Sequence, residues 1–191
     1  MSPRFNQALV FAAELHADQR RKGSATPYIA HLLAVAALVL EYGGNEDEAI
    51  AALLHDAVED QGGAATGEAI RGRFGEDVYQ MVAGCSDTEI VPKPPWRERK
   101  EQHLAHLASA SESVRHVVAA DKLHNVRALI ADYRQAGETL WARFNGGRAG
   151  TLWFYRAMAD VLRRAGSNPL VAELERAVAE LERLVASGAA V

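Results

Sequence analysis

Leu53-Leu54-His55-Asp56-Ala57-Val58-Glu59-Asp60 is the stretch that decides the fold and the chemistry expected of this chain. An adjacent His-Asp pair closes an apolar run, and two more acids follow one helical turn later. Residues four apart share one face of a helix, so we expect His55 to lie above Glu59 and Asp56 above Asp60. Packing alone gives no reason to gather an imidazole and three carboxylates there, whereas metal-assisted hydrolysis does.

A length of 191 residues predicts one globular domain spanning residues 1–191, with two small domains as the less favoured alternative. An apolar content of 49% is enough to bury a single core, and a charged content of 24% is ordinary. The net charge of −4 excludes a general nucleic-acid coat, because no basic field covers the surface. It leaves room for a phosphorylated small ligand bound by a local basic cluster. We therefore expect a small-molecule partner and no nucleic acid.

Cysteine content and hydropathy indicate the cellular compartment in which the protein is expected. The single cysteine, Cys85, excludes an intrachain disulfide and a cysteine-based zinc cluster. The longest apolar run, Leu32 to Leu40, is far shorter than the roughly 20 residues that a membrane span needs. The first residues lack the pattern of a signal peptide. We expect a cytoplasmic protein with no membrane partner.

The apolar periodicity predicts an all-α fold, a helical bundle of about eight to ten helices, because no run of alternating β-branched residues occurs. Asn45 is a plausible N-cap for the helix that delivers the His-Asp pair. A proline-rich segment, 87–96, is expected to be a loop, and its Pro92–Trp96 part is a candidate lid. The predicted helices cover 5–17, 28–40, 46–58, 66–75, 76–86, 97–110, 114–133, 139–144 and 148–165, with a last one from Asn168-Pro169 onward.

One short repeat occurs near the C-terminal end. Ala-Glu-Leu-Glu-Arg stands at 172 and again at 179. The spacing of seven hints at a heptad, but two heptads are too few for a coiled coil of their own. Packing on its own domain is the favoured use of this face, and the seam of a homodimer is the less favoured one.

Three separated segments offer metal-binding groups: His31, the pair His55-Asp56, and Asp121. Each lies in or beside an apolar helix, where an unpaired charge is costly, and one shared cation would remove that cost. Two imidazoles and two carboxylates suit a divalent transition metal such as Mn²⁺, Fe²⁺, Co²⁺, Ni²⁺ or Zn²⁺. Taken singly, each residue has a plainer explanation, as a hydrogen-bonded core histidine or a helix cap. Their combination favours a metal site.

The motifs resemble a known family. The order of His31, His55-Asp56 and Asp121 is similar to that of the HD metal-dependent phosphohydrolase superfamily, whose members are all-α. Within it, the chain looks like the hydrolase domain of the RelA/SpoT family and like its stand-alone members, the small alarmone hydrolases. The resemblance covers about 5–135, with helices at 138–187 packing on that core. It rests on Arg21-Lys22 with Pro27-Tyr28-Ile29-Ala30-His31, on Leu54-His55-Asp56-Ala57-Val58-Glu59-Asp60, and on Ala120-Asp121-Lys122-Leu123-His124-Asn125.

The resemblance implies an activity and roles for nine residues. The activity is Mn²⁺-dependent removal of pyrophosphate from the 3′ position of (p)ppGpp, leaving GDP or GTP. The metal would be held by His31, His55, Asp56 and Asp121. Glu59 and Asp60 would orient and deprotonate the attacking water. Arg21 would contact the nucleobase, Lys22 a phosphate, and Asn125 the base or ribose.

Some questions stay open at the level of sequence. The family usually has Thr after the Glu-Asp pair, whereas here Gln61-Gly62-Gly63 follows. One alternative is a phosphatase of another nucleotide, such as NADPH or a nucleoside phosphate. Another is a metal- or nucleotide-binding module without turnover, against which the Glu59-Asp60 pair argues. Three further cations, Arg97, Arg99 and Lys100, either close over phosphates or form a solvated helix face, and the solvated face is slightly favoured. Arg148 and Tyr155 are weaker candidates for the lining of the pocket, and a core position is at least as well supported for Tyr155.

Overall fold

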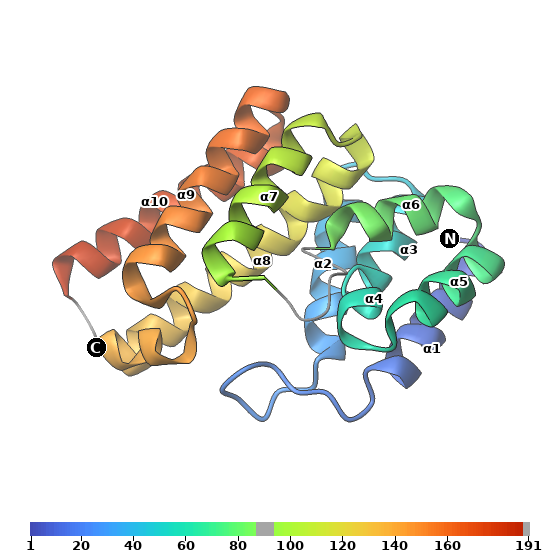
Figure 1. Cartoon of the computed structure of the whole chain (residues 1–191), viewed down its shortest axis with the longest axis horizontal. Coiled ribbons are helices and arrows are strands. Elements are labelled where there is room, and N and C mark those ends of the chain that lie inside the picture. The colour runs from blue at the N-terminus through green and yellow to red at the C-terminus, as the bar shows by residue number, and fades with distance from the viewer. Residues whose placement is uncertain (87–93, 189–191) are drawn as a thin grey trace.

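The computed structural model describes residues 1–86 and 94–188, and this part of the chain is built of helices (Figure 1). It contains no strand; an isolated bridge pairs Arg20 with Pro27 in the loop between the first two helices. The all-α prediction is confirmed. The elements are α1 (Pro3–Leu15), α2 (Ile29–Glu41), α3 (Glu46–Leu54), α4 (Ala57–Asp60), α5 (Gly63–Phe74), α6 (Glu76–Cys85), α7 (Trp96–Ser109), α8 (Glu112–Ala136), the 3₁₀ helix η1 (Gly137–Arg143), α9 (Gly147–Ala165) and α10 (Pro169–Ser187).

Helices α2, α3 and α8 form the centre of the molecule. All residues of α3 from Glu48 to Leu54 are buried, and α2 buries a wide stripe, as its nearly all-apolar sequence predicts. The 25-residue α8 packs against α2, α3 and α6 and also against α10 and η1. Figure 1 shows α8 passing behind α7, with α9 and α10 at one end of the molecule and α1, α5 and α6 at the other. The long helix therefore connects the two ends.

The predicted N-cap at Asn45 is a complete capping box. Its side-chain oxygen accepts a hydrogen bond of 3.0 Å from the backbone N–H of Glu48, and the Glu48 carboxylate accepts one of 2.9 Å from the N–H of Asn45. Both contacts satisfy donors that a helix start leaves unpaired. Ser111 and Asn168 cap α8 and α10 through their side-chain oxygens alone, which accept from the N–H groups of Val114 and Val171. Local sequence thus fixes where these helices begin.

The predicted helix 46–58 is wrong at its C-terminal end. Helix α3 stops at Leu54, and α4 starts only at Ala57. At Asp56 the backbone leaves helical geometry, with φ −100° and ψ −1°, and the His55 ring turns back to the carbonyl of Ala52. Asp56 becomes the residue before α4, although the N–H of Asp60 still bonds its carbonyl at 2.9 Å. The break aims the His-Asp pair inward instead of along a straight helix.

The first two residues of the candidate lid, 92 and 93, lie outside the described residues, and its other three lie within them. Its last residue, Trp96, is not loop: it is the first residue of α7, one position earlier than predicted. The Trp96 ring meets the Trp153 ring of α9 at a centroid distance of 6.2 Å. It also covers Gly146 and Gly150, where a Cβ atom would come within 2.6 and 3.1 Å of the indole. Tertiary packing against α9 thus extends the helix backward.

The heptad-like repeat packs on its own domain, as favoured from the sequence. Helix α10 lies against α8 and α9. Its buried residues recur at three- and four-residue steps, and they are Leu170, Val171, Leu174, Ala177, Val178, Leu181 and Val185. In the described part of the chain, no helix combines the length and apolar character needed to cross a membrane.

Candidate metal centre and active-site cleft

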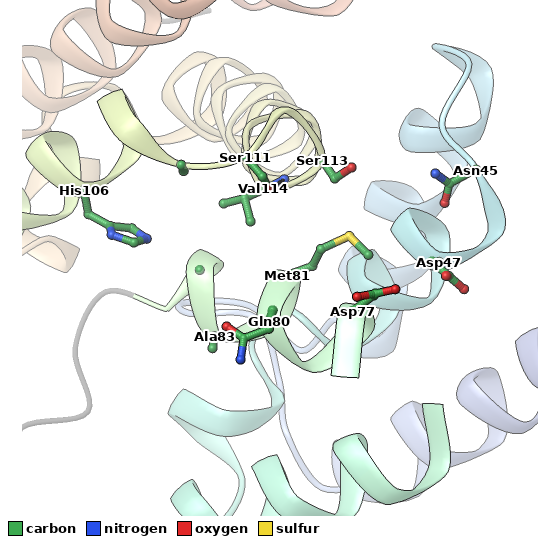
Figure 2. Close-up of a pocket in the computed structure, with 12 residues that line it drawn as sticks. Asn45, Asp47, Asp77, Gln80, Met81, Ala83, His106, Ser111, Ser113 and Val114 are labelled. Atoms are coloured by element: carbon green, nitrogen blue, oxygen red, sulfur yellow. Dashed lines mark hydrogen bonds between the residues drawn. The ribbon is translucent and has the colours of Figure 1, made fainter. Parts of the chain in front are cut away.

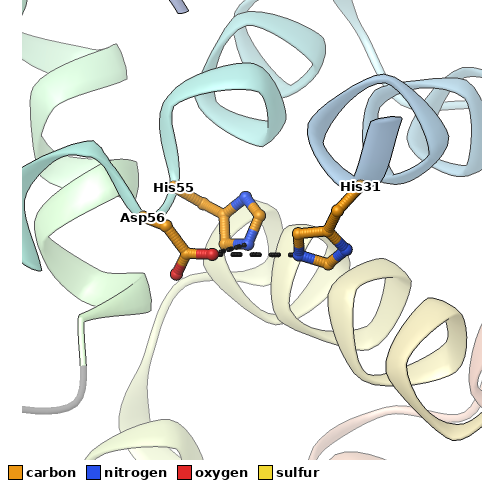
Figure 3. A group of neighbouring side chains, drawn as sticks. All are labelled: His31, His55 and Asp56. Carbon is orange, nitrogen blue, oxygen red and sulfur yellow. Dashed lines mark ion pairs between the residues drawn. The ribbon is translucent and has the colours of Figure 1, made fainter. Parts of the chain in front are cut away.

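The structure brings the four predicted metal ligands together. His31 comes from the first turn of α2, His55 and Asp56 from the break between α3 and α4, and Asp121 from the middle of α8. His55 Nε2 lies 3.0 Å from Asp56 Oδ2 and 3.6 Å from Asp121 Oδ1. His31 Nε2 lies 3.2 Å from the same Asp121 oxygen and 3.8 Å from Asp56 Oδ2. Figure 3 shows the two rings and the Asp56 carboxylate pointing at one another.

This group fits a divalent cation. The ligand atoms of His31, His55 and Asp56 all lie within 4.8 Å of one another. Both Nε2 atoms are buried and lack a hydrogen-bond partner, although carboxylate oxygens lie nearby. Two buried nitrogen acceptors aimed at two carboxylates leave a space whose chemistry suits a borderline divalent metal. The Asp121 carboxylate is held in place by two hydrogen bonds, because Asn125 Nδ2 and Lys122 Nζ each donate to it at 2.5 Å.

The pKa shifts of these residues also indicate that the site favours a positive charge. Burial disfavours the imidazolium form of His55, but the carboxylates of Asp56 and Asp121 outweigh it and hold the pKa of His55 well above its ordinary value. Burial likewise opposes the charge of Asp121, yet Lys122 and the two histidines keep its pKa well below the usual range. For His31, burial dominates and lowers the pKa. Two ionised carboxylates thus converge where a cation is favoured.

The second nitrogen of each histidine has a partner that fixes the ring. His55 Nδ1 donates to the backbone carbonyl of Ala52 at 2.8 Å. His31 Nδ1 lies 2.8 Å from Nδ1 of His124, an imidazole from α8. Burial and the neighbouring His31 and Arg21 lower the pKa of His124 to about 4, so this ring is neutral near pH 7. Such partners hold a metal-ligating imidazole in the tautomer that leaves Nε2 free.

Glu59 and Asp60 lie on α4 but face different parts of one cleft. Glu59 lines a hollow of about 390 Å³ beside α7, which we call the α7 lobe. Asp60 lines a hollow of about 510 Å³ along α8, which we call the α8 lobe. Burial raises the pKa of Asp60, partly offset by a 2.8 Å hydrogen bond from Gln19 Nε2. The two acids therefore flank the metal group from two sides.

The two lobes adjoin, because six residues line both, and we describe them together as one cleft; the metal group lies between them, with His31 lining the α8 lobe and Asp56 and Asp121 lining the α7 lobe. Both are lined by Arg21, Lys22, Tyr28, Asn125, Phe144 and Tyr155. Arg21 Nη2 donates to Asn125 Oδ1 at 2.8 Å, and Lys22 Nζ lies 5.7 Å from the centre of the Phe144 ring. The three predicted substrate-binding residues, Arg21, Lys22 and Asn125, thus stand together between the lobes.

Residues 8–152 match the family model described as HD domain, which covers about three quarters of the chain. This chain belongs to the HD domain family. The resemblance drawn from the motifs is thereby confirmed.

Named relatives narrow the comparison. This HD domain is 44% identical over 126 residues to guanosine-3′,5′-bis(diphosphate) 3′-pyrophosphohydrolase MESH1 of Xenopus tropicalis, a match covering 64% of this chain and 68% of that protein. The MESH1 protein of Homo sapiens is 37% identical over 126 residues, with the same coverage. A probable guanosine-3′,5′-bis(diphosphate) 3′-pyrophosphohydrolase of Synechocystis sp. is 38% identical over 128 residues, 65% of this chain but only 16% of that protein. The chain therefore spans a small part of the longest of these relatives.

Solved structures agree. The structure described as a metazoan ortholog of SpoT that hydrolyses ppGpp superposes with a TM-score of 0.80 at 29% identity, covering 97% of this chain and 98% of that one. A Listeria monocytogenes protein superposes with a TM-score of 0.68 at 26% identity, covering 83% and 99%. With these relatives and its HD domain, the chain is a metal-dependent phosphohydrolase.

Some residues of this HD domain's cleft were not predicted from sequence. The Tyr28 hydroxyl donates to Asp56 Oδ2 at 2.5 Å. Gln19 links Asp60 to Gln61, whose Nε2 donates to Gln19 Oε1 at 2.7 Å. Gln61 stands where the family usually has Thr, so this departure reaches Asp60 through Gln19. The sequence carried a signal only for Tyr28, which lies within the motif that ends at His31.

The remaining cations divide between cleft and surface. Arg99 and Lys100 line the α7 lobe with Lys122, so the solvated-face prediction is wrong for both.

The other candidates differ in their surroundings. Arg97 pairs with Glu101 at 2.7 Å and stacks on Trp153. Arg148 pairs with Glu138 at 3.3 Å. Tyr155 lines both lobes, and burial raises its pKa to about 12.

A hollow of about 660 Å³ lies elsewhere, where α6 faces the start of α8 and the N-terminal end of α3 (Figure 2). It is lined by Met81 and Val114 and by polar side chains that include Asp77 and His106. None of the nine predicted site residues lines it. Chemistry is therefore assigned to the cleft that holds the metal group.

Proposed function

We propose that this HD domain hydrolyses the 3′-pyrophosphate of (p)ppGpp in the presence of Mn²⁺, releasing pyrophosphate and GDP or GTP. One observation carries the proposal: the His31, His55, Asp56 and Asp121 group lies at the junction of two lobes whose walls carry cations. The α7 lobe holds Arg99, Lys100 and Lys122, and the shared wall adds Arg21 and Lys22. A substrate with two diphosphates needs such a local cluster inside an acidic protein.

His31, His55, Asp56 and Asp121 would hold the metal. When bound, a divalent cation polarises the phosphate oxygens and makes a nearby water more acidic. The protein's own part is to keep the ligands aimed at one point. His124 and the Ala52 carbonyl fix the two rings, and Tyr28 fixes Asp56. The metal loaded in this way is expected to be Mn²⁺, with another divalent transition metal as the alternative.

Glu59 and Asp60 would orient the attacking water and accept its proton. The water oxygen forms a bond to the phosphorus attached to the ribose O3′, and the bond from that phosphorus to O3′ breaks. A carboxylate takes the proton from the water, and O3′ gains a proton as it leaves. Because burial raises the pKa of Asp60, this acid is a better proton acceptor than an exposed aspartate.

Arg21, Lys22 and Asn125 would position the nucleotide across the junction. The planar guanidinium of Arg21 suits stacking on a base, and the ammonium of Lys22 suits a phosphate oxygen. Asn125 lies one turn after Asp121 on α8, so its amide reaches both the metal group and the nucleoside side of the cleft. Arg99 and Lys100 add positive charge for the second diphosphate.

The test is to incubate purified protein with Mn²⁺ and ppGpp and to follow pyrophosphate and GDP. We expect turnover that stops with a chelator and returns with Mn²⁺. His55→Ala should lose bound metal and activity, and Glu59→Gln and Asp60→Asn should lose activity while retaining metal. The matched control is His106→Ala, an exposed histidine outside the cleft. Turnover of NADPH or a nucleoside phosphate but not ppGpp would move the substrate to another nucleotide. An active Glu59→Gln, Asp60→Asn double variant would refute their role.

A further inference from the structure

One face of α8 lines the α8 lobe, and its last lining residue is an acid, Asp132. Asp121, Asn125, Ala128 and Asp132 are spaced by four, three and four residues, so they follow one another along a single helix face. The last three line the α8 lobe. Asp132 stands eleven residues after Asp121, about 16 Å farther along the helix axis. It lies beyond the reach of a phosphate held at the metal group.

Cations line both lobes, since Arg21 and Lys22 belong to the shared wall and Arg20 lines the α8 lobe, but the far end of this α8 face carries an acid, Asp132. The cations Arg99, Lys100 and Lys122 line the α7 lobe, on the other side of the metal group. At the far end of the α8 lobe, the Asp132 carboxylate is about half exposed, and its ion pair with Arg143 Nη1 is long, at 3.9 Å. A carboxylate repels phosphate oxygens, so a polyphosphate would not lie against it. An uncharged part of the nucleotide that presents N–H donors would.

We propose that Asp132 selects guanine over adenine as the base of the substrate. This inference rests on the proposed function, in which the metal group holds the 3′-diphosphate and the nucleoside lies along α8. The Watson–Crick edge of guanine carries two adjacent donors, N1–H and the N2 amino group, which match the two oxygens of one carboxylate. Adenine presents an acceptor, N1, beside its N6 amino group, so it would place a lone pair against the carboxylate.

The position of Asp132 in the lining of the α8 lobe favours a role in base recognition over a role only in the ion pair with Arg143. An exposed ion pair between Asp132 and Arg143 adds little to stability and does not require the acid to line a cavity. On α8, the lining residues one turn before Asp132 are Ala128 and Leu129, and Phe144 adds an aromatic ring to the same lobe. They offer apolar surface for a flat base, whereas the other carboxylate of this lobe, Asp60, already accepts a hydrogen bond from Gln19.

The experiment compares kcat/KM for ppGpp, for the adenosine analogue with 3′- and 5′-diphosphates, and for the inosine analogue, which keeps N1–H but lacks the N2 amino group. We expect the natural chain to prefer ppGpp over the adenosine compound by roughly 10- to 100-fold, with inosine between them. In Asp132→Asn, the oxygen pair is replaced by an oxygen and an amino group, so the preference should fall toward unity.

Two matched variants separate specificity from general effects. Asp77→Asn makes the same charge change at an exposed aspartate of the α6 hollow, and it should leave the preference unchanged. Arg143→Gln removes the ion-pair partner and should also retain it. An unchanged preference in Asp132→Asn, or an equal loss in Arg143→Gln, would overturn the inference while ppGpp hydrolysis stands. If the natural chain hydrolyses none of the three compounds, the inference and the proposed function both fail.

Discussion

His31 Nδ1 lies 2.8 Å from His124 Nδ1, so one of these two imidazoles must donate an N–H hydrogen bond to the other. His31 is fully buried and points its other nitrogen, Nε2, at the carboxylates of Asp56 and Asp121. A metal-binding nitrogen carries no proton, so if His31 binds the metal as proposed, it donates through Nδ1 and His124 accepts. The pair thus sets which tautomer His31 adopts.

Replacing His124 should therefore weaken metal binding. We expect His124→Phe to lower Mn²⁺ affinity by roughly 10- to 100-fold, measured by calorimetry or by the electron paramagnetic resonance of free Mn²⁺. His124→Asn keeps an acceptor near the same place and should restore most of the affinity. His106→Phe, an exposed histidine outside the cleft, is the control. Equal affinity in His124→Phe and the natural chain would contradict the assigned tautomer.

Removing the hydrogen bond from Gln19 to Asp60 should shift the pH dependence of activity. Burial already raises the pKa of Asp60, and the Gln19 amide opposes that rise by stabilising the carboxylate. If Asp60 must be ionised, activity falls as pH drops through its pKa. Gln19→Leu should raise that pKa further and move the acid limb of kcat/KM to higher pH. Gln80→Leu, at an exposed glutamine of α6, should leave the profile in place; an unmoved limb in Gln19→Leu would remove Asp60 from the proton transfer.

Metal should stabilise the fold by mass action. At a Mn²⁺ concentration 100 times its dissociation constant, the free energy of unfolding should increase by about 2.7 kcal/mol. For a chain of this size, that corresponds to a rise in Tm of roughly 5 to 10 °C, measurable by calorimetry. In His31→Ala the rise should disappear, because the metal loses a ligand at the junction of the lobes. A full metal-dependent rise in that variant would place the binding site elsewhere.

The apolar face of α10 should act within one chain. Leu181 is fully buried in the interface that α10 makes with α8 and α9. Leu181→Ala should lower the free energy of unfolding by about 2 to 5 kcal/mol, measured by denaturant titration. Because this contact is intramolecular, the loss should not depend on protein concentration. A concentration-dependent loss would instead favour a homodimer through this helix.

Local sequence by itself indicated the all-α fold, the approximate positions of most helices and the identity of the key groups. Apolar periodicity located the helices, and Asn45, Ser111 and Asn168 fixed three of their starts because a cap is a contact over three residues. The four metal-ligand candidates could be named because charged groups at the ends of apolar runs need a common explanation. None of these inferences requires knowing which segments meet.

Tertiary structure decided what those groups face. Helix α3 ends at Leu54, where His55 and Asp56 turn toward α2 and α8, and the neighbouring Glu59 and Asp60 of α4 point into different lobes. Arg99 faces the cleft while Arg97 stacks on Trp153, although both come from one charged run. The physical reason is that periodicity reports which face of a helix is apolar. The partner of a buried polar atom, such as His124 for His31, depends on a neighbour about 90 residues away.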